Sequence, residues 1–182
     1  MILEIGSTKI LKTNYPDTSE LYKSTVDKIK DITGQPNNFP SFIANGSCSF
    51  HNTTAAGRKL YEWKEFKNFI SIQEQDAPIA GMWANRYPPG TFVARHNHNN
   101  LKVNKTVSIG ALLYLKTDKN AGDLVIDIPN YGEYNAKMSQ GDLIIFQSSL
   151  DHWTTPNKSN TDKYVIGLEL VFGDNGKQLD EI

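Results

Sequence analysis

From about residue 80 onward, the sequence is a succession of short apolar segments separated by turn residues. The segments are six to ten residues long, and Pro, Gly, Asn or Asp residues lie between them. Strands this short and this regularly spaced are typical of antiparallel sandwiches and barrels, and they argue against alternating β–α units. In chain order the segments are GMWANRY, TFVARHNH, VSIGALLYLK, DLVIDI, GDLIIF and KYVIGLELVF. We therefore predict a mainly β fold with a double-sheet core over residues 80–173.

The first 79 residues carry helical signals instead. Thr18 or Ser19 is a suitable N-cap, Glu20 follows in the first turn, and Gly34 is a suitable end. Apolar side chains recur along one face of this segment, at Leu21, Val26, Ile29 and Ile32. The pattern predicts a helix over residues 18–34 that packs outside the β-core.

A second, shorter helix is predicted within residues 58–75, from three apolar side chains at three-residue intervals, Leu60, Trp63 and Phe66. The length of 182 residues suits one domain. We expect a single domain made of a helical or irregular N-terminal part (1–79), a jelly-roll core (80–173) and a C-terminal tail (174–182).

The charge balance and the cysteine content narrow the classes of function. With 19 basic and 20 acidic residues the net charge is -1, so no basic surplus points to nucleic acid or to an anionic membrane as a partner. The N-terminal segment is interrupted by Glu4, Lys9 and Lys12, which predicts no signal peptide, and no apolar run approaches the ~20 residues of a membrane span. The single cysteine, Cys48, excludes an intrachain disulfide and is expected to be structural. We expect a cytoplasmic protein.

Two of the four histidines, His96 and His98, alternate on a predicted strand that ends in RHNHNN. Residues two apart on a strand point to the same face, with Cα atoms about 6.5 Å apart, so these two imidazoles can converge on one ion. Arg95 and Asn97 point to the other face. Taken alone, the pair is equally compatible with two solvated histidines near a turn. His51 is expected to be structural or solvated.

Two later residues can complete a site. His152 follows the apolar strand GDLIIF and a short polar loop, and it can meet the first two histidines if the strands pair across a jelly roll. Three imidazoles would leave open positions on iron or a similar divalent metal, whereas the alternative is a loop histidine packed on Trp153. Lys163 shares a strand face with Val165 and Gly167, where an ammonium can hold a carboxylate; the alternative is a lysine that faces water.

The order of these segments resembles the iron(II)- and 2-oxoglutarate-dependent dioxygenases, particularly the prolyl-hydroxylase-like branch and its small phage and marine bacterial relatives. The resemblance rests on WANRYPPGTFVARHNHN, GALLYLK, AGDLVIDIP, GDLIIFQSSLDHWTTPN and KYVIGLELVF, about half of the chain. It implies a double-stranded β-helix, which is the jelly roll that cupins share, with N-terminal helices packed outside. It also implies Fe(II) as cofactor, 2-oxoglutarate as cosubstrate and hydroxylation as the reaction.

The resemblance also implies roles for individual residues. In the family, an HxD pair and a distal histidine bind iron, and a basic residue about ten positions further on holds the distal carboxylate of 2-oxoglutarate. His96, His152 and Lys163 fall on these positions, and Tyr114 falls where such enzymes often place an aromatic residue that contacts the cosubstrate. His98 occupies the aspartate position. Because a neutral imidazole does not neutralise the charge of iron, three histidines would make the site more cationic.

Two other functions stay open on the sequence. Gly90 and the HxH pair match the opening of the first cupin motif, which suggests a three-histidine metalloenzyme that does not use 2-oxoglutarate, although the glutamate expected a few residues later is missing. A non-catalytic jelly-roll module that binds a sugar or a partner chain is the third reading. The substrate, a small molecule or a peptide, is not fixed by the sequence, and the resemblance makes a homodimer a mild expectation.

Overall fold

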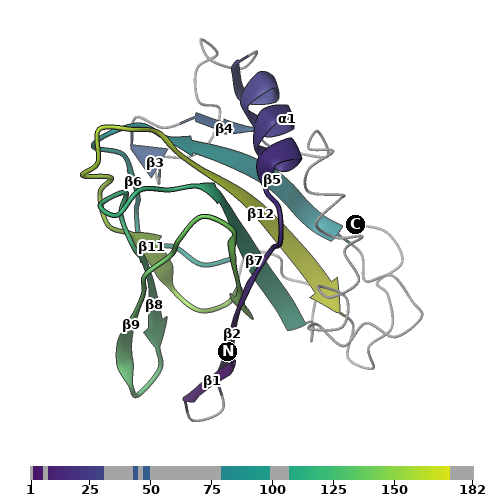
Figure 1. Ribbon diagram of the computed structural model, residues 1–182. Helices are drawn as coiled ribbons and strands as arrows, with labels where there is room; N and C mark the ends of the chain where they lie inside the picture. The colour runs from purple at the N-terminus through teal and green to yellow at the C-terminus, as the bar shows by residue number, and fades with distance from the viewer. Residues whose placement is uncertain are drawn as a thin grey trace.

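The computed structural model describes residues 2–5, 8–30, 43–44, 47–49, 79–98 and 107–172. Within these ranges the chain forms antiparallel strands and a helix, α1 (Ser19–Lys30), as Figure 1 shows. The strands are β1 (Ile2–Ile5), β2 (Thr8–Asn14), β3 (Ile43–Ala44), β4 (Ser47–Ser49), β5 (Ile79–Tyr87), β6 (Phe92–Val93), β7 (Val107–Lys116), β8 (Leu124–Ile128), β9 (Gly132–Ala136), β10 (Asp142–Gln147), β11 (His152–Thr154) and β12 (Lys163–Phe172).

The strands form two facing layers. The large sheet has the order β1-β2-β10-β7-β12-β5-β4, and the smaller one has the order β11-β8-β9. The pair β3-β6 and an isolated antiparallel bridge between His96 and His152 extend the smaller layer along the segment that follows β6. From β5 to β12 the chain passes back and forth between the two layers. The predicted double-stranded β-helix is therefore confirmed.

The long strands of the large sheet are buried on both faces, which explains their almost continuous apolar sequence. On β12, Tyr164, Ile166 and Leu168 pack on the face that also contacts Leu21 of α1. Val165 points the opposite way, into the apolar cluster between the two layers. We call this second side the inward face, and the two buried charged residues of β12, Lys163 and Glu169, share it by alternation.

The predicted N-terminal helix is present as α1, and the residues after Lys30 lie outside the described ranges. The carbonyl of Thr18 accepts a hydrogen bond from the amide of Tyr22 (2.8 Å), so Thr18 is the N-cap residue. The side chain that caps the helix is one residue earlier, because the amide of Ser19 donates to Oδ1 of Asp17 (2.9 Å). No helix in the described part of the chain has the length and apolar character needed to cross a membrane.

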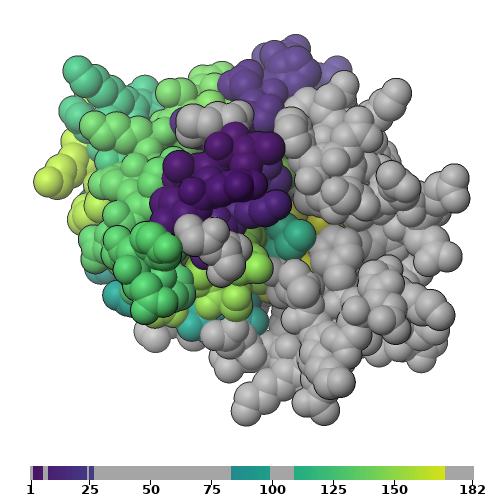
Figure 2. All heavy atoms as spheres, turned by 90° about the horizontal axis from the view of Figure 1, so that it is seen from below, coloured from purple at the N-terminus to yellow at the C-terminus, as the bar shows by residue number. Residues whose placement is uncertain are grey.

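The N-terminal part also contains strands that the sequence analysis did not expect. β1 and β2 form a hairpin, and β2 pairs with β10, so the hairpin extends the large sheet. These residues lie at the surface beside later strands in Figure 2, where they are coloured purple. Since most side chains of β1 and β2 are exposed or half-buried, their apolar alternation is weak. The expected helix within 58–75, the tail at 174–182 and His51 lie outside the described residues.

Candidate metal centre

The three histidines singled out from the sequence come together at one point of the smaller layer. Each of His96, His98 and His152 offers a ring nitrogen, and these three nitrogens lie within 4.8 Å of one another. The ring centroids are 4.3 Å apart for His96 and His152, 5.4 Å for His96 and His98, and 5.2 Å for His98 and His152. This spacing allows the three nitrogens to bind one cation.

Backbone pairing fixes the positions of these histidines. His96 and His152 form a hydrogen-bonded antiparallel pair, with N···O distances of 3.0 and 2.8 Å, so their side chains leave the same face of the layer. The amide of His98 donates to the carbonyl of Ser148 (3.0 Å). The segment 96–98 is therefore held along the loop that leads to His152. The period-two prediction that His96 and His98 share a face agrees with this placement.

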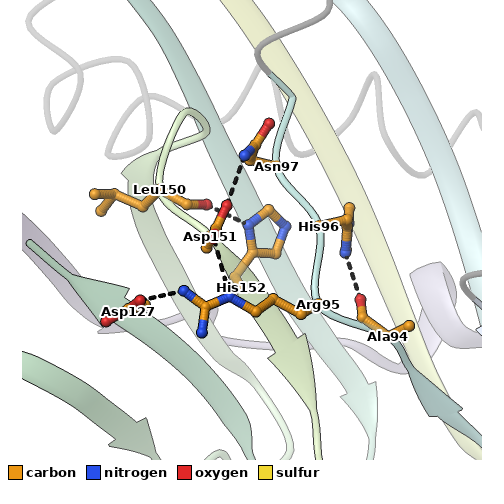
Figure 3. Close-up of polar contacts among 8 residues, drawn as sticks. All are labelled: Ala94, Arg95, His96, Asn97, Asp127, Leu150, Asp151 and His152. Atoms are coloured by element: carbon orange, nitrogen blue, oxygen red, sulfur yellow. Dashed lines mark hydrogen bonds and ion pairs between the residues drawn. The ribbon is translucent and has the colours of Figure 1, made fainter.

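Two of the rings are oriented by backbone carbonyls two residues earlier in the chain. Nδ1 of His96 lies 2.9 Å from the carbonyl oxygen of Ala94, and Nδ1 of His152 lies 2.8 Å from that of Leu150, as the dashed lines of Figure 3 show. Since a carbonyl can only accept, Nδ1 carries the proton in both rings. The lone pair is then on Nε2, which is the arrangement that a neutral metal-binding imidazole requires.

Burial keeps these two rings neutral. Removal from water lowers the pKa of His152 to about 3, and the neighbouring His96 acts in the same direction. Removal from water also lowers the pKa of His96. Both lone pairs are therefore available at neutral pH, because a protonated imidazole cannot bind a metal.

The third ring, His98, has a carboxylate beside it. Its Nδ1 lies 2.9 Å from Oε2 of Glu169, an ion-pair distance without the alignment of a hydrogen bond. The other oxygen of this carboxylate, Oε1, accepts a hydrogen bond from Oγ of Ser148 (3.0 Å). The edge of Trp83 packs on the His98 ring at 5.7 Å between centroids. Trp83 occupies the space over Gly167, where a Cβ atom would lie 2.2 Å from Cε2 of the indole.

A polar cluster on the opposite face of the smaller layer links the same segments. We call Arg95, Asn97, Asp127 and Asp151 the outer clamp (Figure 3). Arg95 donates to Asp127 and, at 2.9 Å, to Asp151, and Asn97 donates to Asp151 at 2.6 Å. The two aspartates thus lie on the side away from the histidine rings. Both carboxylates are bound within the outer clamp.

Lys163 and Tyr114, the predicted cosubstrate residues, lie together on the inward face of the large sheet. Lys163 is 1% exposed. Its Nζ donates to the carbonyl of Gly122 (3.2 Å) and lies 4.9 Å from the ring centroid of Tyr87 and 5.9 Å from that of Tyr114. Burial lowers the pKa of Lys163 to about 8, so the ammonium is still largely charged at pH 7.

The histidines and the lysine belong to the same inter-layer core. The edge of Phe146 packs on His152 at 5.0 Å between ring centroids. Phe146, Tyr87, Tyr114 and Val165 all belong to the apolar cluster between the layers. His152, on which the other two rings pack, and the ammonium of Lys163 therefore border the same apolar cluster, in which charges interact more strongly than in water.

Comparison with solved structures places this arrangement in a known fold. The structure of a prolyl-4-hydroxylase from Pseudomonas putida superimposes with a TM-score of 0.63 at 15% identity, covering 89% of this chain and 91% of that one. A prolyl hydroxylase from Trichoplax adhaerens, in complex with a peptide fragment of the hypoxia inducible factor oxygen degradation domain, gives 0.65 at 16% identity, covering 92% and 84%. The fold is that of the 2-oxoglutarate- and iron(II)-dependent oxygenases.

A third structure extends the oxygenase fold beyond prolyl hydroxylases. HygX from Streptomyces hygroscopicus, with nickel, 2-oxoglutarate and hygromycin B bound, gives a TM-score of 0.66 at 10% identity, covering 91% of this chain and 84% of that one. No family model and no curated protein matches the sequence. At identities of 10–16% the likeness concerns the fold, and at that level the resemblance predicted from the sequence is confirmed.

The sequence analysis missed three residues of this oxygenase-like interior. Tyr87 packs on the ammonium of Lys163, and its hydroxyl accepts a hydrogen bond from Nδ2 of Asn85 (2.6 Å). Trp83 and Glu169 both adjoin His98. Strand alternation places Glu169 on the same face as Lys163, so this signal was present in the sequence. The contact of Glu169 with His98 joins distant segments and has no local signal.

Proposed function

We propose that the protein is a nonhaem iron(II)- and 2-oxoglutarate-dependent oxygenase that hydroxylates a substrate. The observation that carries the proposal is the convergence of three histidine nitrogens within 4.8 Å, in the same inter-layer core as the ammonium of Lys163. The oxygenase fold supports it. Fold likeness alone would not, because one fold hosts many functions.

The residues present fit a divalent metal. His96 and His152 each have Nδ1 bound to a backbone carbonyl and Nε2 available, and His98 completes a face of three nitrogen donors. Imidazole suits iron and leaves further positions open for a cosubstrate and dioxygen. When bound with 2-oxoglutarate and O2, iron(II) supplies oxidative decarboxylation to succinate and CO2, with one oxygen atom entering succinate and the other a substrate C–H bond.

The residues present also fit a dianionic cosubstrate. A buried ammonium next to two aromatic rings and a carbonyl is a compact point charge that can hold a carboxylate. In the proposed function Lys163 binds the distal carboxylate of 2-oxoglutarate, and Tyr114 contacts the cosubstrate beside it. Val165 and Phe146 line the same apolar core and exclude water from it.

A three-histidine metalloenzyme that does not use 2-oxoglutarate is the second candidate. The observation that favours it is His98, because an imidazole stands where the oxygenases have a carboxylate ligand. The two candidates differ in whether the protein chelates the 2-oxo acid at its metal. Lys163 favours the first, since a buried cation without an anionic ligand to hold would only cost stability.

The substrate class follows from neither candidate. Among the solved structures with this fold, one holds a peptide fragment and another holds hygromycin B, so both peptides and small molecules are substrates to test. The homodimer and the cytoplasmic location expected from the sequence stay predictions.

An anaerobic titration tests the proposal. The metal-free protein is loaded with iron(II), and 2-oxoglutarate is added while the visible absorption spectrum is recorded. A new absorption band that saturates with 2-oxoglutarate is expected, and succinate, which lacks the 2-oxo group, should not produce it. His152→Ala should abolish the band because it removes one of three ligands. If iron binds and the wild-type spectrum does not respond to 2-oxoglutarate, the second candidate replaces the first.

A further inference from the structure

Glu169 is a buried carboxylate in an unusual setting on the inward face of β12. It is 6% exposed. Its partners across the sheet are glycines on both sides, Gly81 of β5 and Gly110 of β7. Cross-strand neighbours normally pack side chain against side chain, so a carboxylate between two glycines has room to turn toward the smaller layer. The direction it takes is toward the histidines.

The two oxygens of this carboxylate have different partners. Oε1 accepts the hydrogen bond of Ser148, whose own carbonyl accepts from the amide of His98. Oε2 lies 2.9 Å from Nδ1 of His98. Ser148 therefore fixes both the backbone that carries His98 and the carboxylate that faces its ring. An arrangement held from two sides is a built contact rather than an incidental approach.

His98 differs from the other two histidines in the group that lies beside its Nδ1. His96 and His152 each have Nδ1 against a neutral backbone carbonyl, whereas His98 has a carboxylate there. The distance of 2.9 Å is short enough for the carboxylate to accept the Nδ1 proton once the two groups align. A carboxylate in that role makes a metal-binding imidazole a stronger donor and fixes the tautomer that binds through Nε2. The one histidine that stands in place of an aspartate is thus the one with a negative charge behind it.

We infer that Glu169 is a positioning residue for the metal centre: it holds His98 as an Nε2 ligand and supplies, from behind the ring, the negative charge that an aspartate ligand would bring. The inference rests on the proposed function, since it assumes that the three histidines bind a metal. A cationic centre next to His98 would also offset part of the cost of burying the carboxylate of Glu169, since charges are costly to remove from water.

Removal of the charge without change of shape is the direct test. Glu169→Gln should weaken the binding of Zn(II) and Co(II) to the metal-free protein by about 10- to 100-fold, the usual cost of losing such a partner. Calorimetry in competition with a chelator measures this. Glu133→Gln, the same substitution on exposed β9, is the matched control for net charge and should leave both affinities unchanged. The visible spectrum of the Co(II) protein should change with Glu169→Gln and not with the control.

A compensating substitution distinguishes this role from a merely structural one. His98→Asp restores a carboxylate ligand directly, so the charge behind position 98 is no longer needed. In the His98→Asp background, Glu169→Gln should strengthen metal binding or leave it unchanged, since it relieves repulsion between two neighbouring carboxylates. A loss of the same 10- to 100-fold in both backgrounds would overturn the inference.

The ring tautomer of the wild-type protein gives a test that needs no substitution. In the Zn(II) protein, long-range proton–nitrogen NMR should find the His98 proton on Nδ1 and the metal on Nε2. Binding of zinc through Nδ1 of His98 would overturn the inference, whether or not Glu169→Gln folds. If the wild-type protein binds no divalent metal, the proposed function itself fails. If it binds metal as tightly after Glu169→Gln, with an unchanged Co(II) spectrum, only the role of Glu169 fails.

Discussion

The two ends of the inward face of β12 carry buried charges of opposite sign. Lys163 stands at one end and Glu169 at the other, six residues along the same strand, with Val165 and Gly167 between them. Both side chains are almost completely removed from water. A single strand therefore places a cation and an anion in the same apolar layer without bringing them together.

The two charges differ in their surroundings. The ammonium of Lys163 lies against two phenol rings and a carbonyl, and among the residues that the structure describes no carboxylate forms an ion pair with it. The carboxylate of Glu169 lies against His98 and a serine hydroxyl. The lysine end can thus hold an anionic ligand, and the carboxylate at the glutamate end faces a histidine. In the proposed function, the cosubstrate binds at the lysine end and the metal binds at the glutamate end.

The largest effect is expected at the lysine end. Lys163→Met keeps an unbranched side chain, one heavy atom shorter, and removes its charge. The affinity for 2-oxoglutarate should therefore fall by about 10- to 150-fold, which corresponds to about 1.5–3 kcal/mol for a charge-assisted hydrogen bond. Affinity for Zn(II) should not change. Calorimetry of the metal-loaded protein measures both, with Lys158→Met at an exposed position as control. Unchanged affinity for 2-oxoglutarate would show that Lys163 is not the carboxylate anchor.

In the middle of β12, between Lys163 and Glu169, the backbone of Gly167 packs tightly against Trp83. Gly167→Ala would place a Cβ atom 2.2 Å from Cε2 of Trp83, so the indole must move away from its position beside His98. The free energy of unfolding should fall by about 1–3 kcal/mol, as for other overpacked cores. Gly110→Ala is the control for stability alone, because its added Cβ would meet the nearest atom, Cβ of Ser148, at an ordinary 3.5 Å. It is no control for metal affinity, since Gly110 lies opposite Glu169.

Denaturant titrations measure both glycine variants. Metal affinity should also decrease in Gly167→Ala, because Trp83 packs on His98, whereas the affinity for 2-oxoglutarate should change less. Equal losses in the free energy of unfolding for Gly167→Ala and Gly110→Ala would mean that the space over Gly167 is no tighter than the space over Gly110.

The sequence predicts the fold well where both faces of a strand are buried. β7, β8, β10 and β12 are largely apolar runs between turn residues, and their short, regular spacing indicates an antiparallel two-layer arrangement that buries all of them. β1 and β2 were missed because their half-exposed side chains leave a weak pattern. The dipeptide Gly6-Ser7 between the two runs was nevertheless a hairpin signal.

The site was predictable to the extent that it depends on alternation along one strand. The common face of His96 and His98, and that of Lys163 and Val165, follow from a period of two. The meeting of His152 with the first pair depends on strand pairing across the layer, and the resemblance to a family supplied it. Glu169 shares the alternation of Lys163, but its contact with His98 joins β12 to the segment after β6, and no local sequence pattern predicts such a contact.

The next effect is expected on the pH dependence of the affinity for 2-oxoglutarate, which Lys163 is proposed to bind. Burial lowers the pKa of Lys163 to about 8, so the free protein loses this positive charge as the pH rises through that value. The affinity for 2-oxoglutarate should therefore be constant below pH 7 and should fall toward tenfold per unit above pH 8. Calorimetry from pH 6.5 to 9.5 measures this, and Lys163→Arg, whose guanidinium stays charged, should flatten the profile.

The same shift predicts how stability depends on pH. The folded-state pKa of Lys163 lies below its unfolded value of 10.5, so the unfolded chain binds more protons between pH 8 and 10.5. The cost of the buried charge is present in full below pH 8 and disappears as the pH rises through this window. Relative to Lys163→Met, the wild-type protein should gain stability over these pH units. A difference that stays constant with pH would contradict the buried charge.

The smallest effect is expected on the outer side of the smaller layer. Asp151→Asn makes the same change as Glu169→Gln, a carboxylate replaced by an amide beside the histidine segments. Its partners Arg95 and Asn97 lie near the surface, where ion pairs are weakened by water and salt. These partners lower the pKa of Asp151, so its contribution to stability is lost only as the pH falls below the ordinary value of 3.8.

The two amide substitutions therefore distinguish the effect of a carboxylate in contact with His98 from the effect of a carboxylate that is merely nearby. At neutral pH, Asp151→Asn should lower the melting temperature slightly and leave Co(II) affinity close to that of the wild-type protein, while Glu169→Gln lowers that affinity strongly. Both carboxylates are near the same three rings, but only Glu169 faces a ring nitrogen of a histidine. If the two substitutions weakened Co(II) binding equally, the metal affinity would depend on the total negative charge near the three rings. The contact between Glu169 and His98 would then have no separate effect on that affinity.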